Sequence, residues 1–222
     1  YFGILDLCGF PKDRYYLYQS HWRPEHPMAH ILPHWNWPER VGEITPVHVF
    51  TSGDEAELFL NGKSLGRNKK RPFEYRLAWD NVVYQPGALT VKTWKNGKPW
   101  VEADRSTTGA ALKLLATADR QEIRADGDDL CYVTVSVSDD QGRTVPRSMN
   151  RLYFRVEGAA EIVAACNGDP TSHEPITGAK TMAAFNGLCQ IVLRARKGEA
   201  GEATLHVTAD DLEAGSVAIQ TK

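Results

Sequence analysis

From residue 46 onward the sequence is a succession of short alternating segments separated by turn residues, and this pattern restricts the chain to β-structure. Asn61-Gly62 and Asn96-Gly97 each stand between two alternating runs. Asn-Gly in that setting is the strongest short-range signal of a β-hairpin. After residue 22 no apolar pattern indicates a helix longer than two turns. We therefore expect antiparallel sheets.

Two groups of predicted strands follow one another along the chain. Residues 46–108 hold about six short strands, enough for a small antiparallel sandwich. Residues 109–222 hold about seven, which is the strand count of an immunoglobulin-like domain. The sequence thus predicts a mainly β protein with two tandem immunoglobulin-like β-sandwiches. The strands predicted in the second group are 112–118, 131–139, 151–158, 160–165, 189–195, 203–209 and 216–221.

The first 45 residues have a different pattern. Residues 1–6 read as a strand, and a helix is predicted after Pro11, with Tyr15, Tyr18 and Trp22 spaced three and four residues apart on one face. Residues 23–45 form a connector rich in Pro and Trp. Because a flexible linker is poor in apolar residues, we expect this connector to be rigid and packed.

Charge and hydropathy exclude several classes of function. The net charge is −2 with both signs interspersed, which predicts no nucleic-acid partner and no binding to anionic lipid. No apolar run reaches the roughly 20 residues that a membrane-spanning helix needs. No signal peptide is recognised, but the chain begins inside a predicted element, so any targeting segment is expected upstream.

The four cysteines show neither C-x-x-C spacing nor a histidine partner at zinc-finger spacing. Cys131 and Cys189 are in phase with the apolar residues of their predicted strands. Two interpretations are open for this pair, namely buried free thiols or a bridge across the second sandwich. We favour free thiols.

Acidic turns at 126–129, 139–140 and 167–170 carry oxygen ligands of the kind that Ca²⁺ takes, but none fits an EF-hand loop. Asp and Asn also favour turns for backbone reasons alone. His26, His30 and His34 are four residues apart, yet the intervening prolines argue against a helix there. We predict no metal site and no cofactor.

Trp35 and Trp37, together with His34, could form an aromatic platform for a sugar ring. The alternative is that both indoles pack the connector against its neighbours, and the prolines that bound the connector favour packing. Trp79, Trp94 and Trp100 lie in or beside predicted strands, where burial is the expected role.

Four stretches of the chain stand out, namely YFGILDLCGFPKDRYYLYQSHW (1–22), HILPHWNWP (30–38), VHVFTSGDEAELFLNGKSLGR (47–67) and NGDPTSHEP (167–175). Taken together, they resemble the C-terminal part of glycoside hydrolase family 2 enzymes. The most similar branch is β-galactosidase-like and carries extra immunoglobulin-like modules behind its catalytic barrel. The resemblance covers essentially the whole chain.

The resemblance implies that residues 1–22 are the last strand and helix of an upstream (β/α)₈ barrel. Both catalytic glutamates would then lie on earlier barrel strands, so the isolated chain is expected to be inactive. A retaining glycosidase needs two carboxyl groups about 5–5.5 Å apart, and one strand cannot supply both. In the intact enzyme Asp6, at the end of the predicted strand, would be a substrate-binding carboxylate at the cleft rim, a partner of an active-site side chain or a cap of the following turn. In the isolated chain only the cap is expected. Separated from a barrel, residues 1–22 should be poorly ordered, rearranged or buried against another copy of the chain.

The resemblance predicts a structural role, in which the two modules support the barrel, shape its cleft or mediate contacts in a homo-oligomer. In the intact enzyme, Asp6, Trp35 and Trp37 are the candidate substrate-binding residues, with a galactoside or related glycan as substrate. Two alternatives stay open: an independent carbohydrate-binding module and a protein–protein interaction module. A periplasmic or secreted location is slightly favoured over a cytoplasmic one.

Overall fold

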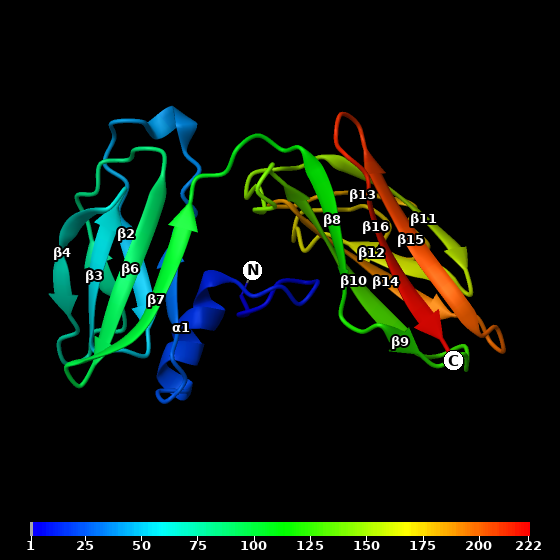
Figure 1. Cartoon of the computed structure of the whole chain (residues 1–222), viewed down its shortest axis with the longest axis horizontal. Coiled ribbons are helices and arrows are strands. Elements are labelled where there is room, and N and C mark those ends of the chain that lie inside the picture. The colour runs from blue at the N-terminus through cyan, green and yellow to red at the C-terminus, as the bar shows by residue number, and fades with distance from the viewer. Residues whose placement is uncertain (1) are drawn as a thin grey trace. The chain divides into compact units, whose positions relative to one another are not determined.

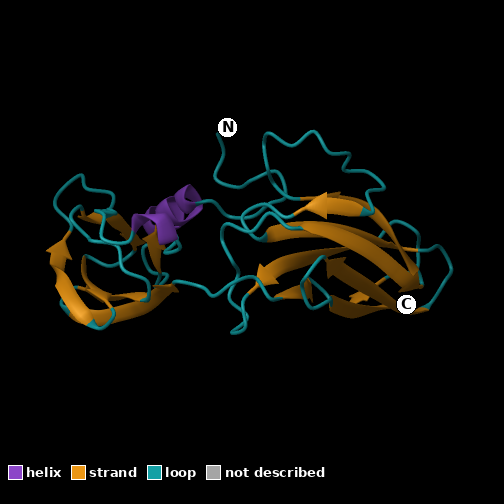
Figure 2. Ribbon diagram, turned by 90° about the horizontal axis from the view of Figure 1, so that it is seen from above, coloured by secondary structure: helices purple, strands orange, loops and turns teal. Residues whose placement is uncertain are grey.

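The computed structural model describes residues 2–222, which form two compact units, each a β-sandwich (Figure 1). The first sandwich comprises residues 2–5 and 11–107, and the second sandwich comprises residues 6–10 and 108–222. Tyr1 lies outside the described residues. The described residues contain one α-helix, drawn in purple in Figure 2, and one 3₁₀ turn, and the predicted mainly β fold is confirmed.

The first sandwich is built from two antiparallel sheets, of order β1-β2-β5 and β4-β3-β6-β7 in the described chain. Apolar residues from both sheets form one core, since alternate residues of β3 and β6 point inward. The exposed edge strand β4 carries lysine and arginine, which discourage pairing with other chains. The elements are α1 (Asp13–Trp22), β1 (Ala29–Leu32), η1 (Pro38–Arg40), β2 (Val47–Thr51), β3 (Glu55–Leu60), β4 (Lys63–Lys69), β5 (Leu77–Trp79), β6 (Ala88–Lys95) and β7 (Lys98–Ser106).

The second sandwich has sheets of order β12-β14-β10-β8 and β13-β11-β15-β16-β9 among the described residues. All neighbours are antiparallel except β16 and β9. One apolar core lies between the sheets, and it includes Cys131 and Cys189. The strands are β8 (Lys113–Ala118), β9 (Glu122–Ile123), β10 (Leu130–Ser138), β11 (Arg151–Gly158), β12 (Ala160–Cys166), β13 (Thr181–Ala183), β14 (Leu188–Ala195), β15 (Gly201–Ala209) and β16 (Gly215–Thr221).

The predicted Asn-Gly hairpins are confirmed. Asn61 and Gly62 connect β3 to β4 with φ values of 51° and 80°, and Asn96 and Gly97 connect β6 to β7 with 51° and 75°. Positive φ at both central residues is the geometry whose twist matches that of the flanking strands. Asn tolerates this left-handed region better than other side chains, and Gly adopts it freely.

Two predicted strands are wrong in extent. Within the strand predicted over 1–6, the described residues form only an isolated bridge between Leu5 and Pro11, because Gly3 and Gly9 adopt positive φ and the chain turns back on itself. The alternating Phe, Tyr, Leu and Trp of residues 73–79 also predict a strand, but only β5 forms within that stretch. The chain instead turns over residues 71–74, where the Glu74 N–H donates to the Arg71 carbonyl at 3.1 Å.

The connector holds a strand that the sequence pattern did not indicate. Strand β1 pairs with β2, and Met28, Ile31 and Trp35 are buried. These side chains pack the segment against its neighbours in the first sandwich. Helix α1 contacts β1 and β2, so it packs on the first sandwich.

Candidate functional site

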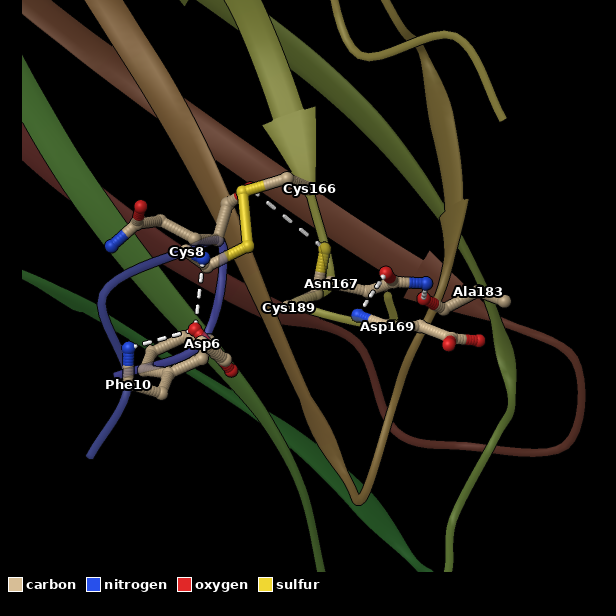
Figure 3. Close-up of a disulfide and its surroundings, with 9 residues drawn as sticks. Asp6, Cys8, Phe10, Cys166, Asn167, Asp169, Ala183 and Cys189 are labelled. Atoms are coloured by element: carbon tan, nitrogen blue, oxygen red, sulfur yellow. Dashed lines mark hydrogen bonds between the residues drawn. A yellow bond between two sulfur atoms is a disulfide. The ribbon is translucent and has the colours of Figure 1, made fainter. Parts of the chain in front are cut away.

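The loop of residues 6–10 is organised by the Asp6 carboxylate, whose Oδ1 accepts hydrogen bonds from the backbone N–H groups of Cys8 (2.8 Å) and Phe10 (2.9 Å) (Figure 3). The Asp6 N–H also donates to the Phe10 carbonyl at 3.0 Å. In this structure Asp6 thus caps its own turn, which is one of the two roles expected for it. These bonds satisfy backbone N–H groups that would otherwise pair with a neighbouring strand.

The same carboxylate lies against the turn after β12. A Cβ placed on Gly168 would fall 2.2 Å from Oδ2 of Asp6, and Gly168 has a φ of +77°. Only glycine meets both conditions without displacing its neighbours. The loop of residues 6–10 therefore packs closely against the turn at Gly168 within the second sandwich.

A disulfide joins Cys8 of this loop to Cys166 at the end of β12, with the two Cα atoms 6.2 Å apart (Figure 3). That separation lies within the usual range for bridged cysteines. The bridge links residues 158 positions apart in the sequence. The sequence pattern did not indicate it, because four cysteines allow three pairings and neither residue lies in an alternating strand.

The other two cysteines are buried free thiols, which confirms the interpretation favoured from the sequence. Burial raises the pKa of Cys131 to about 11 and that of Cys189 to about 12. A thiol reacts through its thiolate, so both side chains act as small apolar core residues.

The turn that carries Gly168 is held by its own amide and carboxylate groups. The buried Asn167 donates from Nδ2 to the Ala183 carbonyl at 2.9 Å, and its Oδ1 accepts from the Asp169 N–H at 3.0 Å. Asp169 Oδ1 accepts in turn from the N–H and hydroxyl of Thr171. These acceptors are occupied by the turn itself, as Figure 3 shows for Asn167.

Trp35 and Trp37 differ in their surroundings. Trp35 is fully buried in the core of the first sandwich, where its indole N–H donates to the Gln85 carbonyl at 2.9 Å. Trp37 is partly exposed and stacks on the His34 ring, with ring centroids 4.2 Å apart. Asp6 belongs to the second sandwich, so the three candidate residues do not lie in one unit.

Helix α1 is fastened to β1 through His30, a contact that the sequence did not indicate. The ring donates from Nε2 to Asp13 Oδ1 at 2.7 Å and stacks on Tyr16 with centroids 3.9 Å apart. The hydrogen bond from His30 holds the pKa of Asp13 below its usual value, although burial opposes this. The packed face therefore carries Tyr16 and the buried Ser20, whereas Tyr18 and Trp22 point away from it and are exposed.

The acidic turns use their carboxylates in local hydrogen bonds. Asp126 Oδ1 accepts from the N–H groups of Asp128 and Asp129. Burial alone would raise the pKa of Asp139, but hydrogen bonds from the Arg143 side chain and the Gly109 N–H outweigh it and lower the value to about 2. Among residues 2–222, no three His, Cys, Asp or Glu side chains converge as a metal site would require. Within the same residues, no helix is both long and apolar enough to span a membrane.

Two protein-family models match this chain, one in each sandwich. The model described as Glycoside hydrolase family 2 C-terminal domain 5 matches residues 114–218. A domain of unknown function, DUF4982, matches residues 42–101.

Named relatives extend the similarity over nearly the whole chain. The chain is 41% identical to the protein named β-galactosidase BoGH2A of Bacteroides ovatus over 96% of its own length and 24% of that relative's. It is 36% identical to a putative β-glucuronidase of Formosa agariphila over 87% of its length and 19% of that relative's. The chain thus spans a quarter or less of these curated relatives.

Solved structures give the same result. A β-glycosidase from Bacteroides vulgatus is 32% identical and superimposes with a TM-score of 0.92, over 99% of this chain and 28% of that one. A β-glucuronidase of glycoside hydrolase family 2 is 26% identical, with a TM-score of 0.87, over 99% of this chain and 22% of that one.

Proposed function

Because this chain belongs to glycoside hydrolase family 2 and corresponds to the C-terminal region of its members, we propose that it is a non-catalytic accessory region that supports the barrel of a glycosidase. The intact protein would hydrolyse O-glycosidic bonds of a galactoside or related β-glycoside. Its catalytic carboxylates would come from the barrel, and residues 1–22 would be the last strand and helix of that barrel. The support for this is that the relatives are at least four times as long as their match to this chain.

The observation that carries this proposal is the outward face of α1. Tyr18 and Trp22 lie against each other, with ring centroids 4.7 Å apart, and Trp22 is 72% exposed. Phe2 and Leu5, in the segment before the helix, are exposed as well. Exposed apolar side chains that lie against each other, as Tyr18 and Trp22 do, mark a surface that packs against another part of a protein. We assign that surface to the barrel.

Within the intact enzyme, Trp37 is a better candidate for a substrate contact than Trp35, because its ring is partly exposed whereas that of Trp35 is fully buried. Asp6 would meet substrate only if its turn opened, since its carboxylate already accepts two backbone hydrogen bonds. These roles are part of the proposal.

The disulfide between Cys8 and Cys166 supports an exported location for the intact protein. Disulfides form and persist in oxidising compartments such as the bacterial periplasm, and they are rare in the cytosol. We therefore propose a periplasmic or secreted enzyme.

The test compares the chain with a longer protein that also contains the barrel. In the longer protein, the Tyr18→Ser/Trp22→Ser double variant should lower the melting temperature by several degrees and reduce glycoside hydrolysis. The same variant should leave the melting temperature of the isolated 222-residue chain nearly unchanged, because these rings are exposed there. Tyr132→Ser is a matched control, since Tyr18 and Tyr132 are both 39% exposed. Equal loss of stability in the short and the long protein would contradict the assignment.

A further inference from the structure

The first sandwich has a cleft of about 670 Å³ between β4 and the segment that leads into β5. Its volume lies in the range of small-molecule and glycan sites. Four cationic side chains and two anionic ones line it, so the lining has an excess of positive charge. The cations are Arg67, Lys69, Arg71 and Arg76, and the anions are Glu74 and Asp80.

The turn at residues 71–74 places a phenyl ring at the edge of this cleft. Phe73 is fully exposed and has a φ of 67°, in the left-handed region that a bulky residue rarely adopts. Pro72 at the second position and positive φ at the third are the pattern of a type II turn, whose third position favours glycine. Neither burial nor local conformation therefore explains a phenylalanine here. Strained residues of this kind cluster at ligand-binding positions.

A second aromatic ring and an arginine adjoin Phe73. Tyr75 is half exposed, and the guanidinium carbon of Arg76 lies 5.4 Å from the centre of its ring. The Tyr75 carbonyl accepts a hydrogen bond from His21 Nε2 at 3.4 Å, which connects this segment to α1.

The cations of the cleft differ in how far they are already neutralised. Arg67 and Lys69 both pair with Glu55, at 2.7 and 3.3 Å, and Arg71 pairs with Glu74 at 3.2 Å. Arg76 is exposed, and the described residues include no carboxylate within ion-pair distance of it. Its planar fork of donors is therefore available to an anion.

We propose that this cleft binds an acidic oligosaccharide, with Arg76 pairing with a sugar carboxylate and Phe73 stacking on the apolar face of a sugar ring. An exposed arginine beside an exposed aromatic ring favours a ligand that has both a carboxylate and a sugar ring. A carboxylate takes two parallel hydrogen bonds from a guanidinium, and an aromatic face covers the C–H face of a pyranose. An acidic peptide would match the charge but would not require Phe73. This proposal rests on the family assignment and does not depend on how α1 packs against the barrel.

The test is isothermal titration of the 222-residue chain with trigalacturonate, with galactotriose as the neutral match and triglutamate as the acidic peptide. Trigalacturonate should bind at least about tenfold more tightly than galactotriose, which has no carboxylate for Arg76, since a lost charge-assisted hydrogen bond costs about this factor. It should also bind more tightly than triglutamate, which has the charge but no sugar ring to stack on Phe73. Arg76→Gln and Phe73→Gly should each weaken binding about tenfold. Arg196→Gln, at an exposed arginine of the second sandwich, should bind within about twofold of the parent chain.

Phe73→Gly also separates binding from folding. Glycine adopts positive φ freely, so this variant should have an unchanged or higher melting temperature while it loses affinity. Absence of binding, equal affinity for galactotriose or triglutamate, or affinity unaffected by Arg76→Gln and Phe73→Gly would each overturn the proposal. A lower melting temperature for Phe73→Gly would do so as well. None of these results bears on whether Tyr18 and Trp22 face the barrel.

Discussion

At several turns of this protein a single side chain stabilises the local conformation, most often a carboxylate that accepts hydrogen bonds from backbone N–H groups. Asp6 and Asp139 are far apart in the sequence, yet each accepts backbone N–H hydrogen bonds within its own loop. The sequence pattern predicted turns rich in Asp and Asn. The hydrogen-bond partners of each carboxylate depend on the folded backbone. Substitutions at Gly168 and Asp139 test these contacts.

At Gly168, replacement by alanine should destabilise the second sandwich by about 2–4 kcal/mol. Roughly 1–2 kcal/mol comes from positive φ, and the remainder from the clash with the Asp6 carboxylate. Gly178→Ala is the matched control, because Gly178 has a φ of +66° and open space around its Cβ position. Urea denaturation measures both. In an Asp6→Ala background the extra cost of Gly168→Ala should disappear, and additive effects would contradict the contact.

Asp139 makes stability depend on pH in the acid range. Its pKa is lowered to about 2 in the folded protein, against about 3.9 in an unfolded chain. The charged form is thus favoured by folding, so its contribution is complete above about pH 4 and is lost as the pH falls through about 2. Asp139→Asn should cost about 1–3 kcal/mol at pH 7 and progressively less below pH 4.

Thermal unfolding of the parent chain and Asp139→Asn between pH 7 and pH 2 measures this difference. Asp140→Asn is the control at the neighbouring exposed position. A stability difference between the parent and Asp139→Asn that stays constant over this pH range would show that the charge of Asp139 is not involved.

At the scale of secondary-structure elements, helix α1 has two faces that meet different surroundings. The spacing of Tyr15, Tyr18 and Trp22 predicts one aromatic face, and Tyr18 and Trp22 are exposed on it, while the contacts with the first sandwich are made through Tyr16 and Ser20 on the other side. Aromatic spacing shows which residues share a face. It does not show which partner that face meets, and the partner of the outward face is the subject of the proposed function.

Removing the contacts of His30 should release α1 without unfolding the first sandwich. Tyr16→Ala, which removes the ring stacked on His30, and Asp13→Asn should each lower the free energy of unfolding by about 1 kcal/mol. The effect of Asp13→Asn is small because the Asp13 carboxylate is more than half exposed and solvent screens its ion pair with His30. Amide hydrogen exchange over residues 13–22 should become faster while that of β3 and β6 does not. Tyr18→Ala, on the exposed face, should leave exchange unchanged. Faster exchange in β3 for Tyr16→Ala would mean that the helix belongs to the core.

At the scale of the whole molecule, each sandwich has a core of its own, and a covalent bridge adds to the second. The cores follow from alternation along each strand, which is why the two-sandwich fold could be predicted. The bridge between Cys8 and Cys166 joins the loop of residues 6–10 to the end of β12 and closes a long stretch of chain. Its contribution to stability comes mainly from restricting the unfolded chain.

The cysteine chemistry of the entire chain should therefore show two classes of sulfur. Denatured but unreduced protein should expose two reactive thiols, and reduction should raise the number to four. In the native state at pH 8, Cys131 and Cys189 should react very slowly with a thiol-specific reagent, because both thiols are buried and their pKa values are raised. Cys8→Ser should destabilise the second sandwich by about 2–5 kcal/mol. Four reactive thiols without reduction would contradict the bridge.

The sequence by itself determined the features that depend on neighbours along the chain. Alternation in runs such as 131–139 predicts strands because side chains of a strand point to opposite faces, and Asn61-Gly62 and Asn96-Gly97 predict hairpins through their own backbone preferences. Its motifs also sufficed to indicate the family, since they are long and occur in order.

Only the tertiary structure decided which distant residues meet. The bridge between Cys8 and Cys166, the fit of Asp6 against Gly168 and the burial of Trp35 all join segments that lie far apart in the sequence. Pairings between distant segments depend on how the sheets pack, and local preferences carry no record of that packing.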